Sequence, residues 1–248
     1  MANWNDQQRE RQTFGRAVPG AEGAVKQRAS YDEGLRSYML SIYNYMASGV
    51  LLTGIVAMAA AATGLAYAFA SGPLMWIVAL APLGFILAMN FGLNRMSQGT
   101  LQLLFWSFAT VMGLSLSTIF LVFTGESIAL TFFATAGAFA GLSLFGYTTK
   151  KDLSAMGTFL IMGVVGLIIA MVLNIFLQSG TLAFVISGLG VLIFAGLTAY
   201  DTQRLKNQYQ YLRGTEMIGK AVIMGATTLY LDFVNMFMFL LQFLGSRE

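Results

Sequence analysis

The sequence predicts an all-α membrane protein, a bundle of seven transmembrane helices, and three observations favour it. Of the 248 residues, 57% are hydrophobic and only 10% are charged, whereas charged residues make up about 25% of an ordinary soluble domain. Uncharged runs of about 20 residues, the length that crosses a bilayer as a helix, follow one another along the chain. The connectors between these runs alternate between basic and uncharged, as expected of a chain that crosses a membrane repeatedly.

The candidate spans are continuous apolar runs, each long enough for one crossing. No transmembrane β-barrel is expected, because barrel strands alternate apolar and polar residues over about ten positions. Small residues within the runs, such as AAAATG at 59–64 and GAFAG at 137–141, favour close helix packing in lipid. In chain order the runs are residues 44–69, 74–93, 101–123, 127–147, 153–177, 181–200 and about 221–244.

The basic residues predict the orientation. The connectors after the second, fourth and sixth spans carry Arg95, the pair Lys150 and Lys151, and a group that begins at Arg204, whereas the connectors SGP, GE and QSG hold no Lys or Arg. Since cytoplasmic loops carry the excess of Lys and Arg, we expect the N-terminus in the cytoplasm and the C-terminus outside. A six-helix alternative, in which the last segment is re-entrant, would place the C-terminus inside.

Two regions are expected. Residues 1–37 form a polar cytoplasmic tail that should be disordered, because its Gly, Gln, Arg and Glu content cannot bury a core. Residues 38–248 form the seven-helix domain. Cysteine and histidine are absent, which removes thiolate chemistry, the commonest metal ligand and the usual general base. A response to pH inside the membrane would therefore have to come from carboxylates.

Two acids fall within or at the edge of the spans, Asp201 in LTAYDTQRLK and Asp232 in LYLDFVNMF. A charge at the bilayer centre costs roughly 2.5 to 3.5 kcal/mol on the insertion scale, so Asp232 is expected to face the bundle interior. Thr228 and Asn235 lie four residues before it and three after it, which places a polar stripe along the last helix. A helix with such a stripe belongs in the middle of a bundle, where its polar groups line a path or meet those of neighbouring helices.

For Asp201, two interpretations stay open. It can be a solvated helix end paired with Arg204 or Lys206, or it can meet Asp232 inside the bundle. Two carboxylates at hydrogen-bonding distance cannot both ionise cheaply, so such a pair shares a proton and titrates as a unit. When ionised, the pair also offers hard oxygen ligands of the kind that Ca²⁺ prefers.

The chain resembles the Bax inhibitor-1-like, or transmembrane Bax inhibitor motif, family, and most of all its short bacterial members. The resemblance is most specific in LYLDFVNMFMFLLQFLG at 229–245, and it extends from about Ser37 to the C-terminus. It is supported by the helix order and by three further motifs: YDTQRLK at 200–206, KKDLS at 150–154 and NIF at 174–176.

The resemblance implies a seven-helix fold with a central last helix and a pH-sensitive Ca²⁺ leak across a bacterial inner membrane. By motif, Asp201 and Asp232 match the family's paired aspartates, the expected proton sensor and transient Ca²⁺ ligands, and Thr228 and Asn235 are expected to line the path. Arg95 is similar to a basic residue that ends helix two in bacterial relatives and pairs with the helix-six aspartate. Some relatives carry a glutamate in helix two, where this chain reads APLGFILAMN.

The sequence therefore predicts a multi-pass membrane protein that conducts cations passively and is not an enzyme. No resident cofactor is expected, and the expected partners are lipid, Ca²⁺ and protons, not nucleic acid. A non-conducting regulator that binds a membrane protease or a cell-death or stress factor is the alternative. An intramembrane aspartyl protease is a lesser alternative: Tyr200 and Asp201 match its first motif, but LYLD stands where Gly-x-Gly-Asp is required, and motifs without their context mislead.

Overall fold

A computed structural model describes residues 21–70 and 72–247, with side chains from residue 31 onward. The chain divides after Tyr38 into an N-terminal unit and a bundle formed by residues 39–248. Residues 21–37, part of the predicted tail, are helical and belong to the first described helix. Residues 1–20 lie outside the described residues, so the prediction of a disordered tail stays a prediction.

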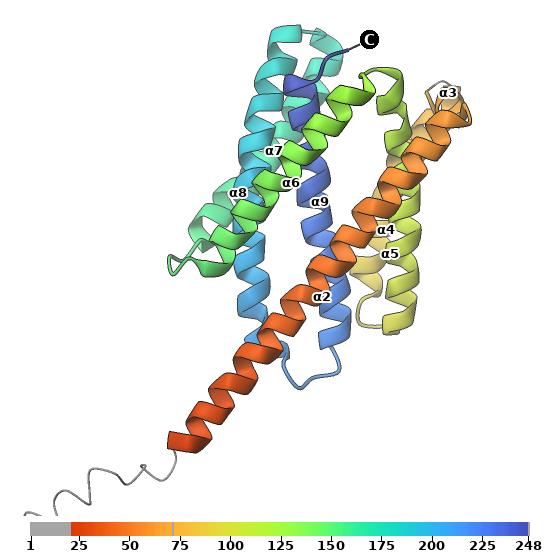
Figure 1. The fold of residues 1–248 in the computed structure, drawn as a ribbon. Coiled ribbons are helices and arrows are strands. Elements are labelled where there is room, and N and C mark those ends of the chain that lie inside the picture. The colour runs from red at the N-terminus through yellow and green to blue at the C-terminus, as the bar shows by residue number, and fades with distance from the viewer. Residues whose placement is uncertain (1–20, 71, 248) are drawn as a thin grey trace, which may run out of the picture. The chain divides into compact units, whose positions relative to one another are not determined.

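The described residues are almost wholly helical, as predicted (Figure 1). They contain no β-strand, and one isolated antiparallel bridge pairs Phe123 with Arg247. The helices are α2 (Ala21–Ala62), α3 (Leu65–Phe69), α4 (Gly72–Gly92), α5 (Gln98–Leu116), η1 (Ser117–Leu121), α6 (Gly125–Thr148), α7 (Ser154–Leu177), α8 (Gly180–Leu212) and α9 (Ile218–Leu244).

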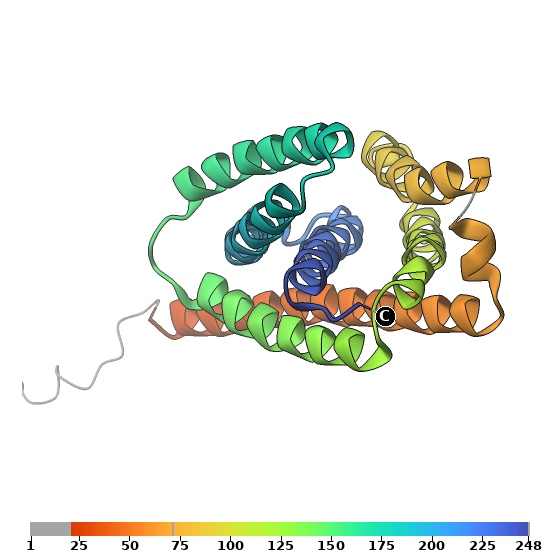
Figure 2. The ribbon, with the colours of Figure 1, turned by 90° about the horizontal axis from the view of Figure 1, so that it is seen from above.

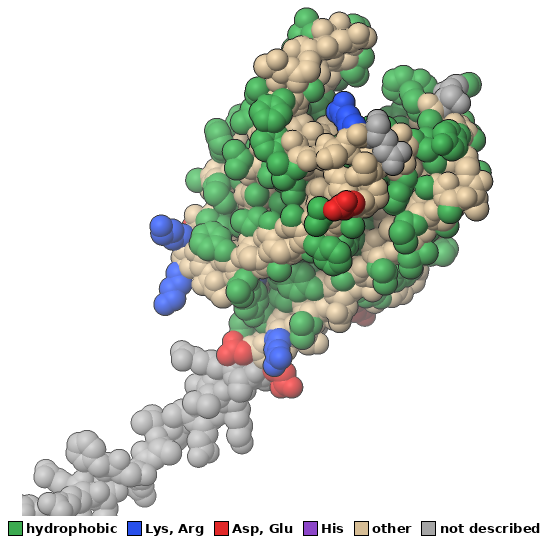
Figure 3. Space-filling model, turned by 45° about the horizontal axis from the view of Figure 1, so that its top comes forward, with side chains coloured by type: hydrophobic (Ala, Val, Ile, Leu, Met, Phe, Trp, Pro, Cys, Tyr) green, Lys and Arg blue, Asp and Glu red, His purple; other side chains and the backbone are tan. Residues whose placement is uncertain are grey.

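Within the part of the chain that the structure describes, seven helical segments are long and apolar enough to cross a membrane, which confirms the predicted number. The last of them, α9, runs without a break over 27 residues. The six-helix alternative with a re-entrant last segment is therefore wrong, since the helix continues past Asp232 for a further three turns. Large hydrophobic side chains remain exposed along the spans, as expected where the surrounding medium is lipid (Figure 3).

The first predicted span has different ends in the structure. It was expected at 44–69, but α2 ends at Ala62, and α3 begins only at Leu65. The reason is Gly64, whose backbone adopts the left-handed conformation at φ 79° and ψ −1°. That conformation has no steric cost for glycine, and it reverses the chain direction that a continuous helix would keep.

The third span also ends differently from its prediction at 101–123. Helix α5 gives way to a 3₁₀ turn, η1, at Ser117. There the hydroxyl of Ser117 donates to the carbonyl of Leu114 at 2.7 Å, and that of Thr118 donates to the carbonyl of Ser115 at 3.2 Å. Such local hydroxyl bonds compete with helical backbone bonds and favour a tighter last turn.

Helix α9 is the most buried of the candidate spans. In its most apolar window 67% of residues are buried, against 11% for the corresponding windows of α4 and α7. It contacts α5, α6 and α8, and Figure 2 shows the other helices arranged around it. This placement explains how α9 can carry polar side chains, because groups on a helix in the interior of a bundle can meet protein partners instead of lipid.

Close helix contacts occur at glycines other than those expected. Gly137 and Gly141, in the GAFAG stretch, have open space where a side chain would be, so this stretch does not serve close packing. Instead Gly146 of α6 lies against the backbone of Ala199 in α8, and Gly113 of α5 lies against the carbonyl oxygen of Thr53 in α2. Small residues at these two positions let the backbones approach closely.

A buried pair of hydrogen bonds joins α2, α5 and α9 close to Asp232. The hydroxyl of Thr53 in α2 lies 2.8 Å from the carbonyl oxygen of Ala109 in α5 and 2.7 Å from the hydroxyl of Tyr230 in α9. A hydroxyl has one proton to donate, and a carbonyl can only accept. Thr53 therefore donates to Ala109 and accepts from Tyr230. These two bonds hold α9 against α2 and α5 at a position two residues before Asp232.

Gln203 of α8 fastens the turn between α6 and α7. Its side-chain oxygen accepts from the backbone N–H of Leu153 at 2.9 Å, and its side-chain nitrogen donates to the carbonyl of Lys151 at 2.7 Å. Both bonds link the turn to the stretch of α8 that carries Asp201, so they fix the position of α8 relative to this turn.

Replacing Gln203 by Ala is expected to lower the free energy of unfolding by about 1 to 3 kcal/mol, because a buried amide N–H and a carbonyl lose their partners. The measurement is denaturation of the purified protein in detergent, followed by helical signal. Gln210→Ala, on an exposed position of the same helix, is the matched control and should stay within about 0.5 kcal/mol of wild type. Equal losses in both variants would contradict the role given to Gln203.

Candidate functional site

The structure brings the two intramembrane aspartates together. Asp201 lies on α8 and Asp232 on α9, and the two residues are 6% and 4% exposed. The two carboxyl groups lie close enough to interact directly with each other. A hydrogen bond between carboxyl groups requires a proton on one of them, so the pair is suited to hold a shared proton.

One cation accompanies the pair. Nη2 of Arg204 lies 3.2 Å from Oδ1 of Asp201, three residues earlier on the same helix. The guanidinium also lies over the ring of Tyr200, at 5.9 Å from the ring centre. Its side chain is 48% exposed, so Arg204 reaches from the exposed surface of the helix toward the buried acids. The interpretation of Asp201 as a wholly solvated helix end is wrong, although its pairing with Arg204 was part of that interpretation.

Arg95, the expected latch, lies in the turn after α4. Its backbone N–H donates to the carbonyl of Gly92 at 2.9 Å. The ion pair that the structure records at Asp201 comes from Arg204, a residue that the sequence had offered only as a local partner. A role for Arg95 as a latch stays a prediction.

The carboxyl pair is incompletely satisfied by protein groups. Oδ1 of Asp201 and Oδ2 of Asp232 are buried, and neither takes part in a hydrogen bond with the described residues. The contact of Asp201 with Arg204 is an ion pair outside hydrogen-bond geometry. Native proteins seldom leave buried polar oxygens without a partner, and such groups often mark a functional site.

The polar side chains predicted along α9 are present, but Thr228 and Asn235 bond to the backbone of α9 itself and not to neighbouring helices. The hydroxyl of Thr228 donates to the carbonyl of Met224 at 3.1 Å, and the amide of Asn235 donates to the carbonyl of Leu231 at 2.8 Å. Both bonds stay within α9. Thr228 also lines a cavity of about 190 Å³ between α4, α8 and α9, and Arg204 lines the same cavity. The cavity thus borders the residues one turn away from each aspartate.

Two further polar residues adjoin the site and were not singled out in the sequence. Thr202, next to Asp201, is fully buried, and its hydroxyl lies 3.2 Å from that of Ser143 on α6. This contact links α6 to the helix that carries Asp201. Serine and threonine are common in transmembrane helices, so sequence alone gave no signal that these two meet.

Asp201 and Asp232 were expected as transient Ca²⁺ ligands, so the donor groups around them matter. Among the described residues, no group of three or more His, Cys, Asp and Glu side chains could hold a metal ion. Ca²⁺ takes six to eight oxygen ligands at a stable site, and the pair supplies two carboxyl groups.

Comparison with known proteins agrees with the sequence resemblance. The family described as inhibitor of apoptosis-promoting Bax1 matches residues 35–248. An uncharacterized protein of Rickettsia prowazekii is 47% identical over 222 residues, which cover 88% of this chain and 93% of the relative. An uncharacterized protein of Caulobacter vibrioides is 45% identical over 246 residues, covering 95% of this chain and 97% of the relative.

A third relative is the inner membrane protein YbhL of Escherichia coli strain K12. It is 40% identical over 234 residues, which cover 93% of this chain and 98% of YbhL. The family match begins within the first candidate span and continues through the last, so it includes both aspartates. This chain is therefore an integral, multi-pass membrane protein that belongs to the Bax inhibitor-1-like family.

Proposed function

We propose that the protein is a passive, pH-sensitive cation leak of the bacterial inner membrane, with Ca²⁺ as the permeant ion and the Asp201 and Asp232 pair as its proton sensor. The observation that carries the proposal is the meeting of two buried carboxyl groups on neighbouring spans, with a single arginine beside them. Ionisable side chains within a membrane are costly, and they commonly mark ion or proton pathways.

The cavity beside the pair supports an entry path. It holds about 190 Å³, and polar side chains of Asn90, Arg204, Gln208 and Thr228 contribute to its wall. A cation entering there meets Arg204 before the aspartates. When the pair is ionised, Asp201 holds Arg204 by charge; when protons neutralise the pair, this attraction is lost and the guanidinium is free to move.

The other half of α9 supports a closed state. Beyond Asp232, Phe237 and Leu241 pack with Ile119 and Phe123 into a buried hydrophobic cluster. Hydrophobic constrictions close channels by excluding water. A conducting state therefore requires movement of this half of α9 against η1, and a change in charge at the pair is the event proposed to start that movement.

The basic residues support the proposed orientation, and a relative supports the proposed location. Positive residues alternate along the connectors as the rule for cytoplasmic loops requires, so we place the N-terminus in the cytoplasm and the C-terminus outside. The relative YbhL is named an inner membrane protein, and we assign the same membrane to this chain.

The direct test is Ca²⁺ flux into liposomes that contain only this protein. The vesicles enclose a fluorescent Ca²⁺ indicator, and the initial rate is measured from about pH 5 to 8, the range over which perturbed carboxyl groups can titrate. Protein-free vesicles are the control. We expect a protein-dependent rate that changes with pH. Absence of such flux at every pH, with folded protein in the membrane, would contradict the leak and favour a regulator that acts by binding other membrane proteins.

A further inference from the structure

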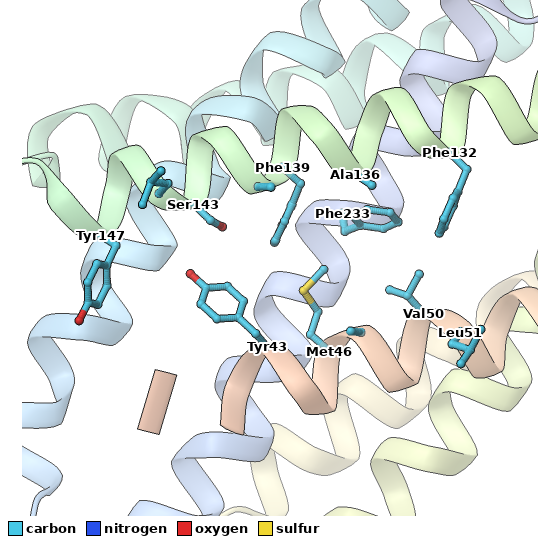
Figure 4. A pocket seen from close by; sticks show the side chains of 13 residues that line it. Tyr43, Met46, Val50, Leu51, Phe132, Ala136, Phe139, Ser143, Tyr147 and Phe233 are labelled. Carbon is cyan, nitrogen blue, oxygen red and sulfur yellow. The ribbon is translucent and has the colours of Figure 1, made fainter. Parts of the chain in front are cut away.

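A large apolar groove lies between α2 and α6, on a side of the bundle distinct from the entry cavity. Its volume is about 630 Å³, within the range of about 300 to 1,000 Å³ that is usual for ligand sites. Figure 4 shows its wall: Met46 and Val50 come from α2, Phe132 and Phe139 from α6, and Phe233 from α9. A second apolar cavity, of about 310 Å³, shares Val50, Phe132 and Phe233 with the groove and extends it along α2 and α6.

The groove is polar at one end and apolar at the other. The hydroxyl groups of Tyr43 and Ser143 lie at one end together with Tyr147, whereas the end near Phe132 and Leu51 has only hydrocarbon side chains (Figure 4). Tyr147 and Phe132 are 15 residues apart on α6, or about 22 Å at 1.5 Å per residue. The hydrocarbon core of a bilayer is about 30 Å thick. The groove thus extends from one interface into the membrane interior, as a lipid of one leaflet does.

Positive charge gathers at the polar end. Nζ of Lys206 donates to the carbonyl of Tyr147 at 2.7 Å and lies 5.2 Å from the centre of the Tyr147 ring. Lys150 and Lys151 are exposed in the turn just after α6. The one acid of that turn, Asp152, stays ionised near neutral pH, because hydrogen bonds from the Ser154 hydroxyl and backbone N–H lower its pKa. The side chains of Lys150, Lys151, Lys206 and Asp152 thus carry three positive charges and one negative charge.

We propose that this groove binds one anionic phospholipid, with an acyl chain along α2 and α6 and the phosphate at the end near Tyr147 and Lys206. The apolar wall accounts for the chain, and the surplus of lysine accounts for a preference for an anionic head group. A zwitterionic lipid fits the same wall but gains less from the lysines. The proposal does not depend on cation conduction, since it rests on the groove and its charges alone.

The bound lipid would contact the walls that hold the aspartate pair. Phe233, at the base of the groove, is the residue after Asp232. Ser143, at its polar end, meets Thr202, the residue after Asp201, at 3.2 Å between hydroxyl oxygens. An acyl chain in the groove keeps water from this side of the pair, so the membrane lipid becomes part of the wall of the site.

The test is native mass spectrometry of the full-length protein in detergent, after incubation with equal amounts of phosphatidylglycerol and phosphatidylcholine that have the same acyl chains. Wild type is expected to retain one phosphatidylglycerol. Lys206→Gln should reduce the preference for phosphatidylglycerol about fivefold, the effect of one basic residue near an anionic head group. Lys206→Arg, which keeps the charge, should preserve that preference.

The groove itself is tested by filling it. Ala140→Trp, at a position in the groove wall, is expected to abolish retention of both lipids. Ala140→Leu, a smaller change that serves as the test if the Trp variant does not fold, is expected to weaken retention. Ala138→Trp is the matched control, because Ala138 is exposed on the same helix and absent from the groove wall. Equal retention of the two lipids by wild type, or full retention by both Ala140 variants, would overturn the proposal. Flux in liposomes is a separate measurement, so failure of either proposal leaves the other to stand on its own result.

Discussion

Replacing Asp232 by Asn is expected to remove the pH dependence of Ca²⁺ flux, and Asp201→Asn is expected to have the same effect. A titrating carboxyl can change a rate by up to about tenfold per pH unit, and Asn has nearly the same shape but no proton to exchange. In the proposed function the pair titrates as a unit, because the two carboxyl groups lie close enough to interact directly. Loss of either member should therefore remove the shared response. The measurement is the initial rate from about pH 5 to 8 in the liposomes described above.

Asp152→Asn is the matched control for these variants. Asp152 undergoes the same change, but it is fully exposed in the turn before α7. The pH profile of this variant should follow that of wild type, and melting in detergent should show that all three variants are folded. An unchanged profile in both Asp201→Asn and Asp232→Asn would place the proton sensor elsewhere and leave the pair as a structural link between α8 and α9.

Replacing Gly146 by Ala is expected to destabilise the contact between α6 and α8. A β-carbon built at this position lies 2.2 Å from the carbonyl oxygen of Ala199 and 2.9 Å from its carbonyl carbon. These are backbone atoms of α8, so a change of rotamer cannot relieve the clash, and α6 has to move away from α8. We expect the free energy of unfolding to fall by about 1 to 3 kcal/mol, the usual cost of overpacking. Denaturation in detergent measures this loss.

Gly141→Ala is the control for Gly146→Ala. It lies on the same helix, but a β-carbon there meets nothing within 4 Å. Alanine is favoured over glycine within a helix by roughly 0.5 to 1 kcal/mol, so this variant is expected to be slightly more stable than wild type. If both variants shift stability in the same direction and by the same amount, the close approach of α6 and α8 at Gly146 does not limit packing.

Much of the fold could be predicted because membrane spans depend on local composition. A helix in lipid must satisfy its own backbone and present apolar side chains, and both requirements can be read from a run of about 20 residues. The ends of spans are less predictable. The break at Gly64 depends on one left-handed residue, and the 3₁₀ turn at Ser117 depends on local hydroxyl bonds. Neither feature changes the mean hydropathy of its span, so the predicted spans continued past both.

The candidate site was predictable to the extent that its residues are unusual for their surroundings. An acid such as Asp232 stands out within an apolar helix, and so its interior position could be inferred from the cost of exposing it to lipid. Arg204 and Thr202 do not stand out in the same way, since charged residues are ordinary at helix ends and threonine is ordinary within spans. Their contacts depend on how α8 is rotated against α9 and α6, and one sequence does not specify that rotation.

By itself, the sequence predicted a chain that crosses a membrane six or seven times, with two acids within or beside its last two spans, because hydropathy and charge are properties of local segments. Only the tertiary structure decided that Asp201 meets Asp232, that Arg204 is the cation beside them, and that α2 and α6 leave a groove between them. Helices that are already stable in lipid can pack in several arrangements. The choice among them depends on side-chain contacts between distant segments.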